Sequence, residues 1–235
     1  MSIATVTQTH SRKADFVSGL REGFPLAVSI FAYGLVFGVL ARQAGLTYFD
    51  ALLMSGVVFA GSSQFAAVAM ISAGVGAGQI ITATLLLNLR HLLMGASLAP
   101  YLQKVKPWKL ALLAHGLNDE SYALTISRFQ RHGGSAAYFL AVGIATFIGW
   151  FGSTVVSAAG VNFLGDPKRL GLDYAFYGVF IGLLVPQLKD RPTVAAAATG
   201  AVSAVLAARF IPGNWYIMIA ALIAVIVGMV TEGER

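Results

Sequence analysis

Asn88-Leu89-Arg90-His91, together with Asn118-Asp119-Glu120-Ser121, decides the predicted fold, because each tetrapeptide places charge inside a long apolar run. Arg90 lies ten residues before Pro100, and Asp119 lies eleven residues after Trp108. If two antiparallel helices meet at a turn between Pro100 and Trp108, both charges lie about 15 Å from that turn, at about 1.5 Å of rise per residue. That depth is half of a hydrocarbon layer roughly 30 Å thick, where ionisable groups are costly and indicate function. The two stretches therefore predict opposite charges at one depth in a membrane.

The composition is that of a polytopic membrane protein. Hydrophobic residues make up 57% of the 235 residues and charged residues only 11%, whereas a soluble domain carries about 25% charged residues. Helix-length apolar runs recur and no stretch shows the short alternation of a membrane barrel, so we predict an all-α polytopic fold. The chain has no cysteine, which excludes a disulfide or a zinc–sulfur site, and no metal or cofactor is expected. The net charge of +6 comes from basic residues in short connections, which indicates orientation in the membrane rather than nucleic-acid binding.

Eight apolar segments divide the chain, at residues 24–41, 51–73, 79–100, 108–126, 136–161, 174–188, 193–210 and 215–230. We expect residues 1–23 to form a cytoplasmic tail, residues 24–230 a single transmembrane transport domain, and residues 231–235 a second tail. Asp50 and Asp173 lie where segments begin, and we expect both carboxylates to cap helices and oppose their dipoles.

An internal repeat is indicated by residues 26–38 and 140–152, which are identical at six of thirteen aligned positions. It divides the domain into repeat one, about residues 24–131, and repeat two, about residues 136–230. If all eight segments span, eight Lys and Arg residues lie on the inner side and seven on the outer side. If segments two and six are re-entrant or broken, the numbers become eleven and four, as the positive-inside rule prefers. We therefore predict six spanning helices plus two re-entrant or broken segments, with inverted halves and the N-terminus inside.

Segment 51–73 contains a candidate substrate site formed by small and polar residues: Gly61, Ser62, Ser63 and Gln64. Glycine lowers helix propensity by about 1 kcal/mol relative to alanine, and serines bond to nearby backbone, so a helix break is expected here. Amide and carbonyl groups freed by such a break suit the two ends of a zwitterion. The alternative is that these small residues only allow close helix packing. Pro186 and Gln187 occupy the matching place in segment 174–188.

Asn88 and Arg90 extend the candidate substrate site into segment 79–100. The planar fork of Arg90 can anchor a substrate carboxylate. The alternative is a structural ion pair between Arg90 and Asp119 or Glu120, which would fix the register of two helices. Both interpretations hold if substrate or a proton competes for the pair.

Segment 108–126 carries a polar stripe, with His115, Asp119 and Tyr122 at the helical spacing i, i+4 and i+7. One polar face on an apolar helix predicts a surface turned toward a water-filled cavity or toward other helices. The candidates for proton coupling or ion pairing are the titratable residues near mid-depth: His91, His115, Asp119 and Glu120. A lone histidine such as His91 is more often a hydrogen-bonded packing residue than a proton relay.

Four stretches resemble one known family: Gly23-Phe24-Pro25, the run 59–64, Asn88-Leu89-Arg90-His91 followed by Leu98-Ala99-Pro100, and Asn118-Asp119-Glu120. Together they are similar to the AzlC family, the large subunits of bacterial branched-chain amino-acid exporters. The resemblance covers about residues 20–230. It implies export of valine, leucine, isoleucine and similar apolar amino acids, and it implies a partner, a small AzlD-type membrane subunit.

The predicted function is a secondary transporter rather than an enzyme. The sequence has no glycine-rich phosphate loop ending in Lys-Ser or Lys-Thr, so the energy is expected from an ion gradient, with export coupled to protons. One alternative is a passive channel or an assembly subunit. Another is an intramembrane serine hydrolase that uses Ser62 or Ser63 with a histidine, although the Gly-x-Ser-x-Gly elbow is absent. The expected location is the bacterial cytoplasmic (inner) membrane, with several passes and a cytoplasmic N-terminus.

Overall fold

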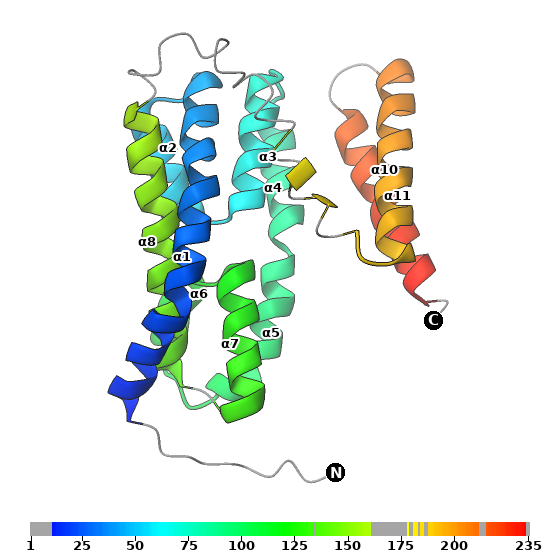
Figure 1. Ribbon diagram of the computed structural model, residues 1–235. Coiled ribbons are helices and arrows are strands. Elements are labelled where there is room, and N and C mark those ends of the chain that lie inside the picture. The colour runs from blue at the N-terminus through cyan, green and yellow to red at the C-terminus, as the bar shows by residue number, and fades with distance from the viewer. Residues whose placement is uncertain are drawn as a thin grey trace. The chain divides into compact units, whose positions relative to one another are not determined.

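The computed structural model describes residues 11–133, 135–160, 178, 181–182, 184–185, 188–211 and 215–233, and no strand occurs among them. The chain divides into two compact units, one made of Met1–Phe65 and Leu86–Gly165, the other of Ala66–Leu85 and Asp166–Arg235. The elements are labelled in Figure 1: α1 (Arg12–Gln43), α2 (Tyr48–Leu53), the π-helix η1 (Met54–Val58), α3 (Gly61–Ser72), α4 (Ala77–Asn88), α5 (Arg90–Leu102), α6 (Pro107–His115), α7 (Asp119–His132), α8 (Ala136–Gly160), α10 (Arg191–Phe210) and α11 (Trp215–Gly233).

The predicted class, an all-α polytopic membrane protein, is confirmed. Five helical stretches are long and apolar enough to cross a membrane: Arg12–Gln43, Ala77–Leu102, Ala136–Gly160, Arg191–Phe210 and Trp215–Glu232. The first of them begins at Arg12, so residues 12–23 of the expected cytoplasmic tail are helical and continuous with it. Their place in the cytoplasm stays a prediction. Most of segment 174–188, with Pro186 and Gln187, lies outside the described residues, as does Asp173.

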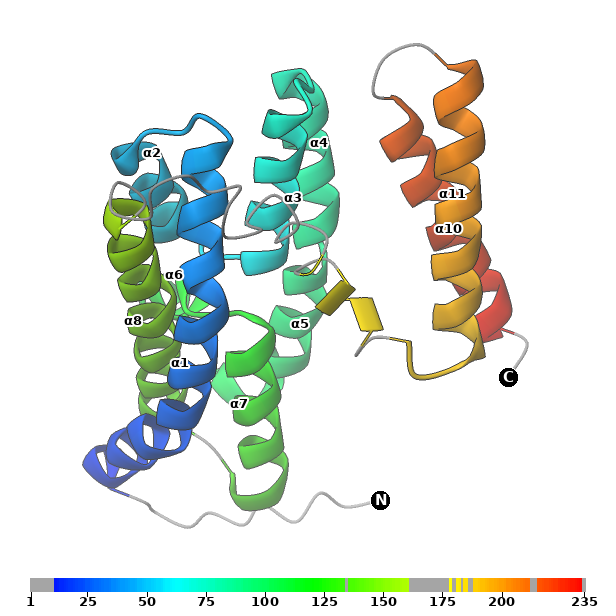
Figure 2. The same cartoon turned by 45° about the horizontal axis from the view of Figure 1, so that its top comes forward.

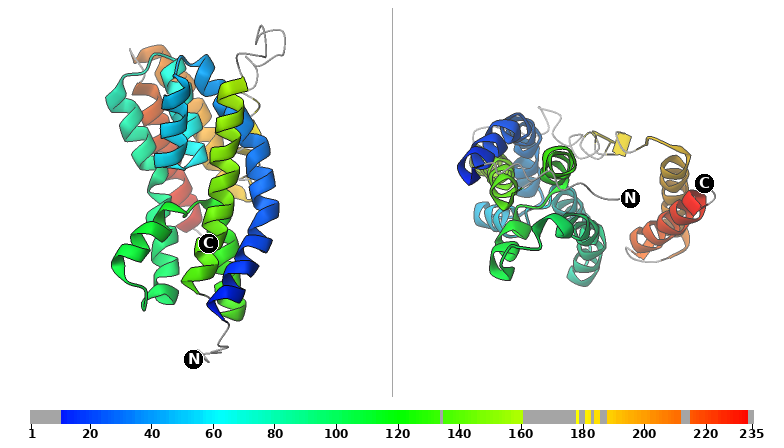
Figure 3. Two further views of the ribbon diagram at one scale, coloured as in Figure 1. Left: turned by 90° about the vertical axis from the view of Figure 1, so that its left-hand side faces the viewer. Right: turned by 90° about the horizontal axis from the view of Figure 1, so that it is seen from below.

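Helices α1 and α8 lie side by side, as Figures 2 and 3 show, and form the most extensive helix pair of the first unit. Gly19 lies against Tyr138 near the start of both helices, and Gly38 lies against Ser157 near the end of both. The two helices therefore run parallel. Small residues at these contacts let the two backbones approach closely, which is how helices associate in lipid.

This parallel packing differs from the predicted inversion of the two halves. The aligned stretches 26–38 and 140–152 lie in α1 and α8, and inverted halves would make these helices antiparallel. The physical reason is that segment 108–126 does not cross the unit. Tyr101 lies at the end of α5 and Phe129 near the end of α7, and their ring centroids are 5.3 Å apart. After α6 and α7, the chain is therefore back at the end of the unit where α5 finished. The charge count treated this segment as a span, which puts the loop that follows it at the end of the unit opposite to where the structure has it.

Segment 51–73 is broken, as predicted. Phe59 has a φ of 43°, a left-handed conformation that ends the π-helix, and α3 begins two residues later at Gly61. At the start of α2, Thr47 and Asp50 form a capping box, which confirms that Asp50 caps a helix. The hydrogen bonds from Thr47 hold the pKa of the Asp50 carboxyl below its ordinary value.

The second unit contains the antiparallel pair α10 and α11. A Cβ added to Gly200 of α10 would lie 3.2 Å from the Ala224 side chain of α11, so these helices also pack through small residues. Asp190 caps α10 through a capping box with Thr193.

Candidate functional site

Three interrupted helices of the first unit meet at one place. The interruptions are Phe59-Ala60 between η1 and α3, Leu89 between α4 and α5, and residues 116–118 between α6 and α7. Each interruption is followed by a helix N-terminus, where the first backbone N–H groups lack helical acceptors and the dipole favours negative charge.

Arg90 joins the three helices that begin here. It is the first residue of α5, its Nη2 donates a hydrogen bond to Ser62 Oγ of α3, and its Nη1 lies 2.9 Å from Asp119 Oδ2 of α7. The structure therefore forms the predicted ion pair, and Asp119 is the partner. The Arg90 side chain is 32% exposed and that of Asp119 is 48% exposed. The Nε of Arg90 and the Oδ1 of Asn88 are buried without a hydrogen-bond partner among the described residues.

Glu120 has a different partner from Asp119, on a different helix. Its Oε1 accepts a hydrogen bond of 2.9 Å from the hydroxyl of Tyr33 in α1. The Tyr33 ring packs on Trp150 of α8, with ring centroids 5.6 Å apart. Adjacent residues of a helix point about 100° apart, so the two carboxylates contact different helices.

The start of α7 is fixed by Asn118. Its Oδ1 accepts from the backbone N–H of Ser121 at 2.7 Å, while Ser121 Oγ and the Asn118 N–H complete a capping box. Its Nδ2 donates to Thr146 Oγ1 of α8 at 3.2 Å. Because Asn118 and Ser121 satisfy the helix end, the side chains of Asp119 and Glu120 remain free to contact other helices.

The polar stripe predicted at His115, Asp119 and Tyr122 is wrong as a single helical face. The helix ends at His115 and a new one begins at Asp119, so the spacing i, i+4 has no meaning across the interruption. The His115 ring packs instead on Phe59 and Phe147, at centroid distances of 5.9 and 5.6 Å.

The four residues 61–64 serve different purposes. Ser62 contacts Arg90, and Gly61 packs on Trp150, where an added Cβ would lie 3.3 Å from the indole. Ser63 and Gln64 are fully buried and hold the interruption together, since Ser63 Oγ donates to the Ala60 carbonyl and Gln64 Oε1 accepts from the Ala60 N–H. Only Ser62 thus presents its polar group to the charged pair.

The two candidate histidines, His91 and His115, have partners other than the serines. The Nδ1 of His91 is 3.1 Å from the carbonyl oxygen of Asn88, one turn earlier on the same chain segment. Within the described part of the chain, neither Ser62 nor Ser63 has a recorded hydrogen bond with a histidine. The geometry of a serine–histidine nucleophile is therefore not formed between these residues.

Tyr33 and Trp150 belong to the site and were missed in the sequence. Tyr33 is the only tyrosine in segment 24–41, and Trp150 lies in the middle of its segment, whereas Trp108 and Trp215 each open one. An indole or a phenol away from the headgroup zone needs a packing or hydrogen-bonding reason. The mid-segment positions of Tyr33 and Trp150 were therefore the signal in the sequence that could have identified them.

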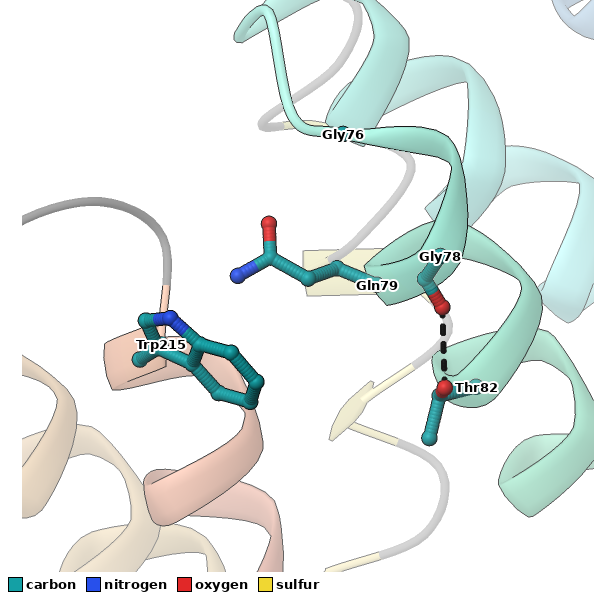
Figure 4. A pocket seen from close by; sticks show the side chains of 5 residues that line it. All are labelled: Gly76, Gly78, Gln79, Thr82 and Trp215. Atoms are coloured by element: carbon teal, nitrogen blue, oxygen red, sulfur yellow. Dashed lines mark hydrogen bonds between the residues drawn. The ribbon is translucent and has the colours of Figure 1, made fainter.

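A hollow in the second unit has a different chemical character. It is lined by Gly76, Gly78, Gln79, Thr82 and Trp215, and Thr82 Oγ1 donates to the Gly78 carbonyl at 2.8 Å (Figure 4). None of the described residues that line it is charged.

Comparisons with known proteins agree with the resemblance seen in the motifs. The family model described as AzlC protein matches residues 25–164, more than half of the chain. A Helicobacter pylori (strain J99) protein named uncharacterized membrane protein is 30% identical over 92% of this chain and 96% of its own length. The inner membrane protein YgaZ of Escherichia coli (strain K12) is 28% identical, with 82% of each chain covered. The branched-chain amino acid transport protein AzlC of Bacillus subtilis (strain 168) is 24% identical, over 95% of this chain and 89% of its own. No solved structure matches the chain.

Proposed function

The chain belongs to the AzlC family of membrane transport proteins, and from this premise we propose that it is a secondary transporter that exports branched-chain and other apolar amino acids. The protein lies in the cytoplasmic (inner) membrane of a bacterium, with its N-terminus in the cytoplasm. It acts as the large subunit of a two-component exporter whose second component is a small AzlD-type membrane subunit. Export is coupled to protons.

One observation carries the proposal: Arg90 is held between Ser62 and Asp119 where three helices begin. The guanidinium fork matches a carboxylate geometrically, and its pairing with Asp119 shows that a carboxylate reaches it. The α-carboxylate of an amino acid can replace that of Asp119, with the Ser62 hydroxyl and backbone N–H groups of the first turn of α3 as further donors.

The ammonium group of the substrate then takes the place that Arg90 leaves. Asp119, once displaced from Arg90, is an unpaired carboxylate beside the bound zwitterion and attracts its positive end. The site holds one ion pair before binding, Arg90 with Asp119, and two afterwards, Arg90 with the substrate carboxylate and Asp119 with the substrate ammonium group. Substrate binding therefore leaves no charge unpaired in a medium of low dielectric. The apolar class of substrate is supported by the name of the Bacillus subtilis relative.

Counterflow in proteoliposomes tests the proposal. The chain is reconstituted with its small partner and loaded with unlabelled valine, and entry of labelled valine is measured. We expect exchange by the wild type and a loss of at least tenfold in Arg90→Ala. Arg90→Lys keeps the charge without the fork and should be intermediate. Arg131→Ala, an exposed arginine of α7, is the control and should exchange like the wild type. Absence of exchange by the wild type with its partner present would reject the function.

A further inference from the structure

Asp119 and Glu120 are adjacent carboxylates with different partners. Asp119 pairs with the guanidinium of Arg90 at 2.9 Å, whereas Glu120 accepts a hydrogen bond from the neutral hydroxyl of Tyr33 at 2.9 Å. Among the described residues, Asp119 forms an ion pair and Glu120 does not. One carboxylate is therefore already compensated by a cation, and the other is not.

The helices around Glu120 supply few other titratable groups. Between residues 23 and 41 of α1 the only titratable side chain is Tyr33. In α8 it is Tyr138, whose hydroxyl donates to Glu22. At the start of α5 lie Arg90, which pairs with Asp119, and His91, whose Nδ1 lies by a backbone carbonyl. Protonation of Glu120 is therefore the simplest way to neutralise the net negative charge of Arg90, Asp119 and Glu120 together.

We propose that Glu120 binds and releases the coupled proton, that Tyr33 positions its carboxylate, and that Asp119 is the counter-ion that the substrate displaces. This inference rests on the proposed function. The sequence alone gave four candidates for proton coupling or ion pairing, and the inference assigns proton binding to Glu120 and ion pairing to Asp119. The step is a proton transfer only: the Glu120 carboxylate takes a proton from water on one side of the membrane and returns it on the other.

The geometry also couples this proton to the substrate. The ammonium group of a zwitterion drawn to Asp119 lies next to Glu120, because the two residues are consecutive. A nearby positive charge favours the ionised form of a carboxyl group, so substrate binding drives the proton off Glu120. Competition between an ammonium group and a proton for neighbouring carboxylates is what exchange of substrate for proton requires.

Two transport assays separate the roles of the carboxylates. Counterflow without a pH gradient measures substrate exchange, and valine movement driven by an imposed pH gradient measures coupling. We expect Glu120→Gln to lose at least tenfold in gradient-driven transport and less than about threefold in counterflow. Asp119→Asn should lose at least tenfold in both assays. Asp50→Asn also removes one carboxylate, at an exposed helix cap, and should match the wild type in both.

Proton release on valine binding is a readout without transport. Valine is added to purified protein in weakly buffered detergent solution with a pH indicator dye. The wild type should release protons, Glu120→Gln should release none, and Tyr33→Phe should release them with a pH profile moved to higher pH, since it loses a donor to the carboxylate. The assignment of the proton to Glu120 would be overturned if Glu120→Gln kept full gradient-driven transport and released protons like the wild type. The role of Tyr33 would be overturned if Tyr33→Phe left the pH profile unchanged. Loss of wild-type counterflow would reject the proposed function instead.

Discussion

Arg90 and Asp119 are the first residues of two different helices, α5 and α7, and their Nη1 and Oδ2 atoms lie 2.9 Å apart. Both helices begin at this contact, so the guanidinium and the carboxylate lie at one level of the unit although 29 residues separate them in sequence. The pair is partly exposed, because the described helices enclose neither side chain completely.

This exposure predicts that breaking the pair changes transport far more than stability. Partly exposed pairs contribute about 1 kcal/mol or less, which corresponds to a change in Tm of about 2–4 °C. We expect Asp119→Asn to stay within that range in a thermal unfolding measurement in detergent, while its counterflow falls at least tenfold. A drop in Tm above about 10 °C, with normal exchange by the protein that remains folded, would make the pair structural.

The contact between α1 and α8 predicts a difference between two glycines of the same helix. A Cβ added at Gly149 would lie 2.5 Å from the Ala27 carbonyl oxygen, whereas one added at Gly152 would lie 3.8 Å from the Phe31 ring. Overpacking of this kind costs about 1–3 kcal/mol. Gly149→Ala should lower Tm clearly and Gly152→Ala should leave it nearly unchanged. Equal values for the two variants would contradict the parallel packing of these helices.

The capping box at the start of α7 predicts a stability cost for Asn118→Ala. The variant loses the acceptor for the Ser121 N–H and the donor to Thr146, and replacing such a cap by alanine costs about 0.5–2 kcal/mol. Asn118→Ser is the matched control, because serine keeps a capping oxygen. If α7 instead continued α6 as one helix, alanine would be the better residue and would raise Tm.

Arg128 connects α7 to α1 and α8 at the far end from Arg90. Its Nη1 lies 3.3 Å from Glu22 Oε1, and its guanidinium lies 5.2 Å from the centre of the Tyr138 ring. Arg128→Ala should lower Tm by an amount that corresponds to about 1 kcal/mol at low salt. The exposed Arg131 of the same helix is the control, and its alanine variant should unfold like the wild type.

The Arg128 effect should also shrink as salt is added, because added ions screen partly exposed pairs. Unfolding of the wild type and Arg128→Ala in 0.05 and 1 M salt measures this. A difference in Tm that does not depend on salt would indicate that Arg128 acts through packing rather than charge.

Two of the three helix interruptions around Arg90 show where sequence reasoning succeeds and where it fails. The interruption before Gly61 was predicted because glycine and two serines weaken a helix locally, whatever surrounds them. The interruption at residues 116–118 was missed, although Asn118 and Ser121 have the spacing of a capping box. The same residues also fit a polar stripe on a continuous helix, and only contacts with α8 distinguish the two.

The sequence by itself determined that this is an all-α membrane protein with opposite charges held at one level, because hydropathy and helical rise are local properties of the chain. Only the tertiary structure decided that Arg90 pairs with Asp119, that Glu120 turns to Tyr33, and that α1 and α8 run parallel. Asp119 and Glu120 are adjacent carboxylates, so their local sequence does not distinguish their partners. The direction of the α7 axis after residues 116–118 determines which helix each carboxylate contacts. That direction depends on close packing between segments far apart in the chain, such as Gly116 on Gly143, which no local pattern encodes.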